Sequence, residues 1–420
     1  MKTTTSGFSA CAATVLLVAV ALALSLQGCV SRNPSADMRH TCEGKSGHVE
    51  GTSQLFDPAT AVRPSPKPIV KVIEFTDNGE LTDRCQLSDV YGEVKGLNED
   101  PSIASHPKMI VFYVHGWKHD AALGDPDRLK FKELIEYLSA VETNRHSNRD
   151  VVGIYVAWPG RSVAVPGLDN LTFWARKGAA DRVSESGNFS KIIGAVNSIR
   201  CQRKNPNDVI VAIGHSFGAR ILFSSISPMI LYDLQMKHPG KLFAPYRLLG
   251  PPVDLTILLN PAFEASRYTA LDSSRRYQES FSPNQPPSLL SISTSNDDAT
   301  RLAFPVGQFI GTRWDERERT TLGNYNVYQT HTMKHDSPTS PDTAKGTFWY
   351  DHYCWGNICL ARKDDDVQRG NPFLVAGTDA SILDGHNGIW SEQFKEWMAH
   401  FIESTEEAER QSGVNRGTCF

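Results

Sequence analysis

Short apolar runs recur along the chain and alternate with longer amphipathic segments. The runs are rich in β-branched and aromatic residues and lack the polar alternation of a strand with one face in water. We expect each run to form a strand buried on both faces of a sheet. The expected strands lie at 69–75, 109–114, 151–157, 209–213, 253–259 and 288–293, with a weaker one at 373–376.

The amphipathic segments carry apolar residues at three- and four-residue spacing, which is typical of helices with one buried face. We expect helices within 129–141, 171–200 (in one or two pieces), 217–236 and 391–402, the last with Ser391 as its N-cap. Strands that alternate with helices predict an α/β fold with a mostly parallel central sheet and helices on both faces. Active sites of such sheets lie at the carboxyl ends of the strands.

The N-terminal region departs from this pattern. Lys2 precedes an apolar run from Ala10 to Leu26, which leads into Leu26-Gln27-Gly28-Cys29. This resembles a bacterial lipobox, which implies a signal peptide over 1–28 and lipidation of Cys29. The alternative is a membrane-anchoring helix that is never cut, although the run is short for a bilayer span.

A polar segment rich in Pro, Gly and Ser follows, so we expect a tether over 29–68, one domain over 69–412 and a tail over 413–420. The residue after the lipidated cysteine is Val30 rather than aspartate. By resemblance to Gram-negative lipoproteins, this implies anchoring to the outer membrane of the cell envelope.

Composition narrows the classes further. The 420 residues have a formal net charge of -4, with 40% hydrophobic and 21% charged residues. These values indicate a globular protein, and nothing in them points to a nucleic-acid partner. Export would favour disulfides among the cysteines other than Cys11 and Cys29, although the sequence does not choose their pairing. These are Cys42, Cys85, Cys201, Cys354, Cys359 and Cys419.

One apolar run leads directly into a Gly-x-Ser-x-Gly motif. In VIVAIGHSFGAR (209–220), Ser216 follows a buried strand and precedes an expected helix. A nucleophilic serine needs such a sharp strand-to-helix turn, with the flanking Gly214 and Gly218 leaving room for it. We therefore predict that Ser216 is the nucleophile of a covalent mechanism.

A second loop supplies candidate donors for a developing oxyanion. His115-Gly116-Trp117 follows the strand at 109–114. The backbone amides of Trp117 and Phe217 are predicted to form an oxyanion hole. The alternative is an ordinary glycine loop in which His115 only packs.

The general base and the acid must follow the serine. Among 13 histidines, His386 stands out because it lies in a glycine-bounded loop before the last helix. We favour Asp297 as the acid, since it is the first carboxylate after the strand at 288–293; Asp298 and Glu264 remain alternatives. If His386 is not the base, then the next candidates are His331, His335 and His352. The spacing of His331 and His335 hints only weakly at a metal site, and we predict no metal and no organic cofactor.

The order Ser, Asp, His, with the oxyanion loop first, is that of the α/β-hydrolases. On Trp158-Pro159, the elbow motif and Ser295-Asn-Asp-Asp-Ala-Thr300, the chain resembles bacterial esterase/lipase-like members of that superfamily. The resemblance covers about 69–402 and implies the α/β-hydrolase fold, a Ser-His-Asp triad and hydrolysis of carboxylic esters. It does not imply a particular substrate. The partners we expect are a small-molecule or lipid ester as substrate and, through lipidated Cys29, the membrane.

The rival functions are a catalytically silent envelope binding protein of the same fold, a serine peptidase and a thioesterase. The chain also departs from a minimal hydrolase by a long insertion between Asp297 and His386. Its aromatic segment Phe348–Trp355 forms either one wall of an acyl pocket or a surface excursion stapled by Cys354 and Cys359.

Overall fold

The structure of the chain is a computed structural model. It describes residues 68–96, 106–145, 147, 149–160, 173–236, 248, 252–277, 281–282, 285–297, 315–336, 348–363 and 367–411. Cys29, Asp298 and the expected signal peptide, tether and tail therefore lie outside the described residues. Of the helices that are described, none has the length and apolar content needed to cross a bilayer.

A ten-stranded, mostly parallel sheet forms the centre of the molecule, in the order β1-β3-β2-β4-β5-β6-β10-β7-β9-β8. Neighbouring strands are parallel from β1 through β7, whereas β9 runs antiparallel to both β7 and β8. Every residue of β2, β3 and β4 is buried, as their unbroken apolar runs predict. The strands are β1 (Ile69–Glu74), β2 (Lys108–Val114), β3 (Asp150–Ala157), β4 (Val209–His215), β5 (Leu255–Leu259), β6 (Leu289–Thr294), β7 (His331–His335), β8 (His352–Trp355), β9 (Ile358–Arg362) and β10 (Phe373–Thr378).

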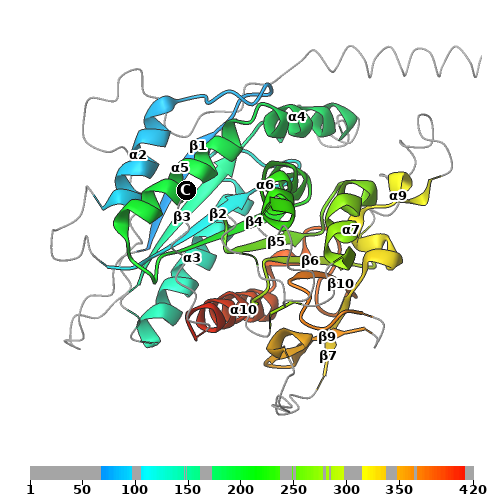
Figure 1. The fold of residues 1–420 in the computed structure, drawn as a ribbon. Helices are drawn as coiled ribbons and strands as arrows, with labels where there is room; N and C mark the ends of the chain where they lie inside the picture. The colour runs from blue at the N-terminus through cyan, green and yellow to red at the C-terminus, as the bar shows by residue number, and fades with distance from the viewer. Residues whose placement is uncertain are drawn as a thin grey trace, which may run out of the picture.

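Helices cover both faces of this sheet (Figure 1). One face packs against α2 (Arg84–Lys95), α4 (Phe173–Glu185), α5 (Asn188–Arg203), α6 (Phe217–Met236) and α7 (Thr269–Tyr277). The other face packs against α3 (Pro126–Asn144) and α10 (Glu392–Gln411). Each face therefore has its own apolar core, and the predicted α/β architecture is confirmed. The short elements are α9 (Glu316–Arg319), η2 (Ala265–Tyr268), η4 (Leu322–Asn324), η5 (Asn326–Tyr328), η6 (Trp349–Asp351) and η7 (Gly388–Trp390).

The predicted helices are present, and the region 171–200 contains two of them, α4 and α5. The side chain of Ser391 accepts a hydrogen bond from the amide of Phe394 at 3.4 Å, as expected of the N-cap of α10. Sequence analysis did not identify α2, whose N-cap Asp83 accepts from the amide of Cys85. It also did not identify β7, β8 and β9, which extend the sheet beyond β10.

The aromatic segment Phe348–Trp355 lies at the far edge of the sheet, where it forms η6 and β8. Its rings pack against α10: Trp349 lies 5.5 Å from Phe401 between ring centroids, and Tyr353 lies 5.6 Å from Trp397. In the sheet, β5, β6, β10, β7 and β9 separate β8 from the strand that precedes Ser216. The pocket-wall hypothesis is therefore wrong, because these rings extend the core around α10.

The predicted use of cysteines in disulfides is confirmed. Cys354 and Cys359 form a disulfide across the β8–β9 hairpin, where their residues are directly opposite each other. Cys85 and Cys201 are also disulfide-bonded.

Candidate active site

Ser216 stands alone between β4 and α6, in a turn that few residues adopt. Its φ is +56°, in the left-handed region that a residue with a side chain enters rarely. Gly218 makes this turn possible, since a Cβ there would overlap the backbone oxygens of Val114 and His115. The turn is fixed by the neighbouring strand: the Ser216 amide donates to the Leu259 oxygen at 3.0 Å, and the Ser216 oxygen accepts from the Ala262 amide at 3.1 Å.

Ser216, His386 and Asp297 form one chain of hydrogen bonds. His386 Nε2 lies 2.7 Å from Ser216 Oγ, and His386 Nδ1 lies 2.7 Å from Asp297 Oδ2. A carboxylate only accepts, so Nδ1–H donates to Asp297 and leaves the Nε2 lone pair to accept from the serine hydroxyl. Ser216 and Asp297 are buried, whereas the His386 side chain is 16% exposed. This arrangement can transfer the hydroxyl proton to the ring.

The sheet brings these three residues together from distant parts of the sequence. Ser216 follows β4, Asp297 lies shortly after β6, and His386 lies between β10 and α10. The strands β4, β5, β6 and β10 are neighbours and parallel, so their carboxyl ends share one edge.

The loop after β2 lies beside Ser216. A Cβ on Gly116 would come 3.0 Å from the Cβ of Ser216, so a side chain there would crowd the turn. Among the described residues, the backbone amides of Trp117 and Phe217 donate no hydrogen bond. Two unused donors beside a serine hydroxyl are what an oxyanion hole requires.

His115 holds this loop against the end of β3. Its Nε2 accepts from the Trp158 amide at 3.1 Å, and its backbone oxygen accepts from Trp158 Nε1 at 2.9 Å. Its Nδ1 lies 2.8 Å from the oxygen of Gly116. Burial lowers the pKa of His115, so the ring is neutral and has a structural role in linking this loop to β3.

Glu264, the alternative acid, serves a different purpose. Its carboxylate accepts from Arg220 of α6 at 2.7 Å and also pairs with Lys177 of α4. The same Arg220 binds Asp181 of α4 through Nε and Nη2 at 2.7 and 2.9 Å. Burial alone would raise the pKa of Glu264, but the two cations outweigh it and lower this pKa to about 2. Glu264 thus links α4 and α6 through its ion pairs. The carboxylate that pairs with His386 is that of Asp297.

Replacing Glu264 with glutamine is expected to lower the free energy of unfolding at pH 7 by roughly 3 kcal/mol. This value follows from the difference between the pKa of about 2 in the folded protein and the ordinary carboxyl pKa of 4.5. The native pKa is depressed, so the stabilisation is complete above about pH 4.5 and is lost as the pH falls towards 2. Urea unfolding at pH 7 and at pH 3 tests this. The difference in the free energy of unfolding between wild type and Glu264→Gln should be smaller at pH 3 than at pH 7. A difference independent of pH would contradict this prediction.

The other candidate histidines lie away from the Ser216–His386 pair. His331 is in β7, where burial and then Arg362 lower its pKa to about 3, and His352 is in β8. His331 and His335 belong to one strand, so their four-residue spacing does not place them on a helical face. In the part of the chain that the structure describes, no group of three or more His, Cys, Asp or Glu residues could hold a metal ion.

Two side chains that sequence analysis did not identify contact the loop of His386. The sequence assigned no role to either of them, His215 or Asn260. Both donate to the backbone oxygen of His386, from His215 Nε2 at 3.0 Å and from Asn260 Nδ2 at 2.9 Å. The position of Asn260 directly after a buried strand of the sheet was the only available signal.

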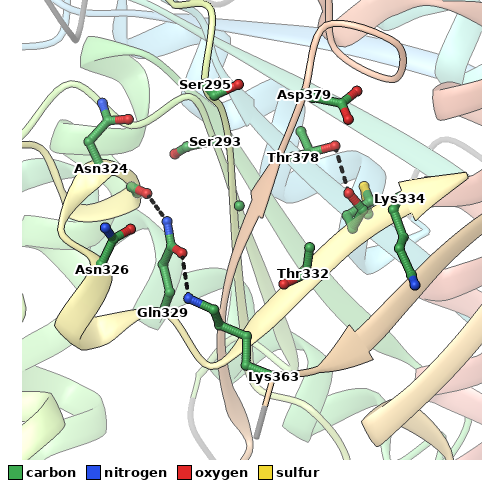
Figure 2. Close-up of a pocket in the computed structure, with 13 residues that line it drawn as sticks. Ser293, Ser295, Asn324, Asn326, Gln329, Thr332, Lys334, Lys363, Thr378 and Asp379 are labelled. Carbon is green, nitrogen blue, oxygen red and sulfur yellow. Dashed lines mark hydrogen bonds between the residues drawn. The ribbon is translucent and has the colours of Figure 1, made fainter.

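A polar cavity of about 430 Å³ lies over β6, β10 and β7 (Figure 2). Gln329 spans one side of it, donating to the Gly323 oxygen at 2.7 Å and accepting from Lys363 at 3.2 Å. None of Ser216, Asp297 and His386 lines this cavity. Its lining consists of Ser293, Ser295, Gly323, Asn324, Asn326, Gln329, Thr332, Met333, Lys334, Lys363, Gly377, Thr378 and Asp379.

No protein-family model matches the chain, and no curated protein does. Among solved structures, it is similar to phospholipase PlaB from Legionella pneumophila, with 12% sequence identity and a TM-score of 0.31. The match covers 74% of this chain and 64% of the phospholipase. The complex of that phospholipase with thio-NAD also matches, with 12% identity, a TM-score of 0.28 and coverage of 73% and 64%. The chain thus spans less than two thirds of the length of these neighbours.

Proposed function

We propose that the chain is a serine hydrolase of the α/β-hydrolase fold that cleaves carboxylic esters. The observation that carries this proposal is the hydrogen-bonded chain from Ser216 Oγ through His386 to Asp297. A serine hydroxyl becomes a useful nucleophile when a neighbouring base accepts its proton. The left-handed turn at Ser216 supports the same function, as do the amides of Trp117 and Phe217, which donate to no described residue.

The reaction has two halves. Ser216 Oγ attacks the ester carbonyl carbon while its proton moves to His386 Nε2. The carbonyl oxygen becomes an oxyanion, which the amides of Trp117 and Phe217 stabilise, and Asp297 stabilises the imidazolium. The tetrahedral intermediate collapses, the C–O bond to the alcohol breaks, and the alcohol leaves with the proton from Nε2. An acyl-Ser216 ester remains.

Water completes the cycle. His386 Nε2 accepts a proton from a water molecule as that water attacks the acyl carbonyl. The second tetrahedral intermediate expels Ser216, which recovers its proton from Nε2, and the carboxylic acid is released. All proton transfers in this scheme use one ring nitrogen.

The experiment that tests the proposal is labelling with a fluorophosphonate, followed by a panel of esters of increasing acyl length. We expect the probe to modify Ser216 and Ser216→Ala to remain unlabelled. Hydrolysis of esters but not of matched amides or thioesters would separate an esterase from a peptidase or a thioesterase. An unlabelled wild type would favour the binding-protein function.

We further propose that the protein is attached to a membrane of the cell envelope through lipidated Cys29. The lipobox-like Leu26-Gln27-Gly28-Cys29 supports this. A lipid or cell-envelope ester is then a sensible substrate class, because the site would act close to a membrane surface.

Replacing Cys29 with serine is expected to move the protein from the membrane fraction to the soluble fraction. Each buried methylene of an acyl chain contributes about 0.8 kcal/mol, so losing the anchor removes most of the affinity for the bilayer. Fractionation and the mass of the N-terminal peptide are the measurements, with Cys11→Ser as the matched control. Wild type that carries no lipid on Cys29 would contradict the proposal.

A further inference from the structure

The backbone oxygen of His386 accepts two hydrogen bonds from buried side chains. His215 Nε2 lies 3.0 Å from it, and Asn260 Nδ2 lies 2.9 Å from it. The same Asn260 nitrogen lies 3.4 Å from the oxygen of Gly385. His215 and Asn260 are only 2% and 1% exposed. The loop is therefore fastened at the residue whose ring lies between Ser216 and Asp297.

Asn260 connects this loop to the strand that leads to Asp297. Its side-chain Oδ1 accepts from the Thr294 amide at 3.0 Å. Its backbone N–H donates to the Ile292 oxygen at 2.8 Å. Its φ is +43°, a conformation that asparagine tolerates better than most residues. One side-chain amide thus spans the distance between the end of β6 and the loop of His386.

His215 connects the loop to the residue before Ser216. Its buried Nδ1 has no hydrogen-bond partner among the described residues and faces Gly116, where a Cβ would come within 2.8 Å of it. The proton of the neutral ring therefore sits on Nε2, which donates to the His386 oxygen. Burial and the nearby ring of His386 hold the pKa of His215 well below its usual range. The contact is that of a neutral donor.

We infer that Asn260 and His215 are positioning residues that hold the backbone of His386 so that its Nε2 stays within reach of Ser216. This inference rests on the proposed hydrolase function. The two donors reach one oxygen from the ends of two neighbouring strands, so losing either donor loosens the loop and losing both releases it. Proton transfer depends on sub-ångström placement of the base, whereas binding of the ester does not require the base.

The test compares two variants with matched controls. Asn260→Asp keeps the acceptor for the Thr294 amide but has no side-chain N–H for the His386 oxygen. Its control is Asn326→Asp, at an exposed position of η5. His215→Leu removes the second donor, while His215→Gln restores one. We expect kcat to fall by about 10-fold to 100-fold in Asn260→Asp and in His215→Leu, with KM within about twofold. His215→Gln should recover most of the loss, and Asn326→Asp should match wild type.

The double variant Asn260→Asp/His215→Leu should lose more than the product of the two single losses, because no described side chain then holds the oxygen. A loss of kcat/KM that comes from KM alone, with kcat unchanged, would overturn the inference. So would a His215→Gln variant as slow as His215→Leu. A circular-dichroism melt identifies any variant that fails to fold, and Asn260→Gly, which suits the positive φ, then replaces Asn260→Asp.

A second measurement separates this inference from the proposed function. The proton on His386 Nδ1, hydrogen-bonded to Asp297, can be followed by NMR without any substrate. We expect its exchange with water to accelerate in Asn260→Asp but not in Asn326→Asp. If the wild type is not labelled by the fluorophosphonate, the hydrolase proposal fails, and this exchange rate still decides whether Asn260 holds the loop. Unchanged exchange would reject the positioning role.

Discussion

Ser216→Ala is expected to lower kcat for an ester by on the order of 10⁶-fold, the scale found when a triad serine is removed. The variant keeps the fold, since alanine is smaller and the Gly218 contacts remain. Steady-state hydrolysis of the best ester from the panel is the measurement. The methyl side chain has no oxygen to attack the carbonyl carbon, so the acyl-enzyme cannot form.

His386→Ala should cost about as much as Ser216→Ala, and the double variant little more than either. Nucleophile and base act as one unit, so their removal is strongly non-additive. Additive losses would mean that the two side chains work in separate steps. Near-normal turnover by His386→Ala would move the base elsewhere, and His331, His335 and His352 would then be replaced in turn.

Asp297→Asn is expected to lower kcat by roughly 10⁴-fold while leaving KM largely unchanged. An amide in place of the carboxylate can present N–H to His386 Nδ1, which favours the tautomer with the proton on Nε2. That tautomer cannot accept the proton of Ser216. The same measurement of ester hydrolysis applies.

The neighbouring carboxylate provides the matched control for this variant. Asp298→Asn changes the same functional group one residue along the chain and is expected to leave kcat within a few-fold of wild type. A larger loss in Asp298→Asn than in Asp297→Asn would reassign the acid. Since Asp298 lies outside the described residues, this comparison also tests the choice between the two aspartates.

The pattern of apolar runs predicts much of the sheet because each central strand is buried on both faces. Runs such as 109–114 and 151–157 have no polar alternation, and they appear as β2 and β3 within a residue or two. The chain order of Ser216, Asp297 and His386 likewise predicts which residues meet, since parallel strands end at one edge.

The outer strands could not be predicted in the same way. β7 and β8 contain His, Lys and Tyr with partly exposed positions, so their composition resembles that of a loop. β7 pairs with β9 from a distant part of the sequence, which no local pattern encodes, whereas β8 and β9 form a short hairpin. The roles of His215 and Asn260 also depend on which backbone oxygen lies opposite them, and periodicity contains no information about that.

The left-handed turn at Ser216 has a consequence for when activity can appear. Its geometry is held by hydrogen bonds with Leu259 and Ala262, which belong to the next strand and its loop. A chain in which β5 has not yet docked lacks these two hydrogen bonds, which help to keep Ser216 in this costly conformation. Nucleophile, base and acid are then separate stretches of polypeptide. We expect a newly synthesised or translocating chain to be chemically inert, with reactivity arising late in folding together with the assembled sheet.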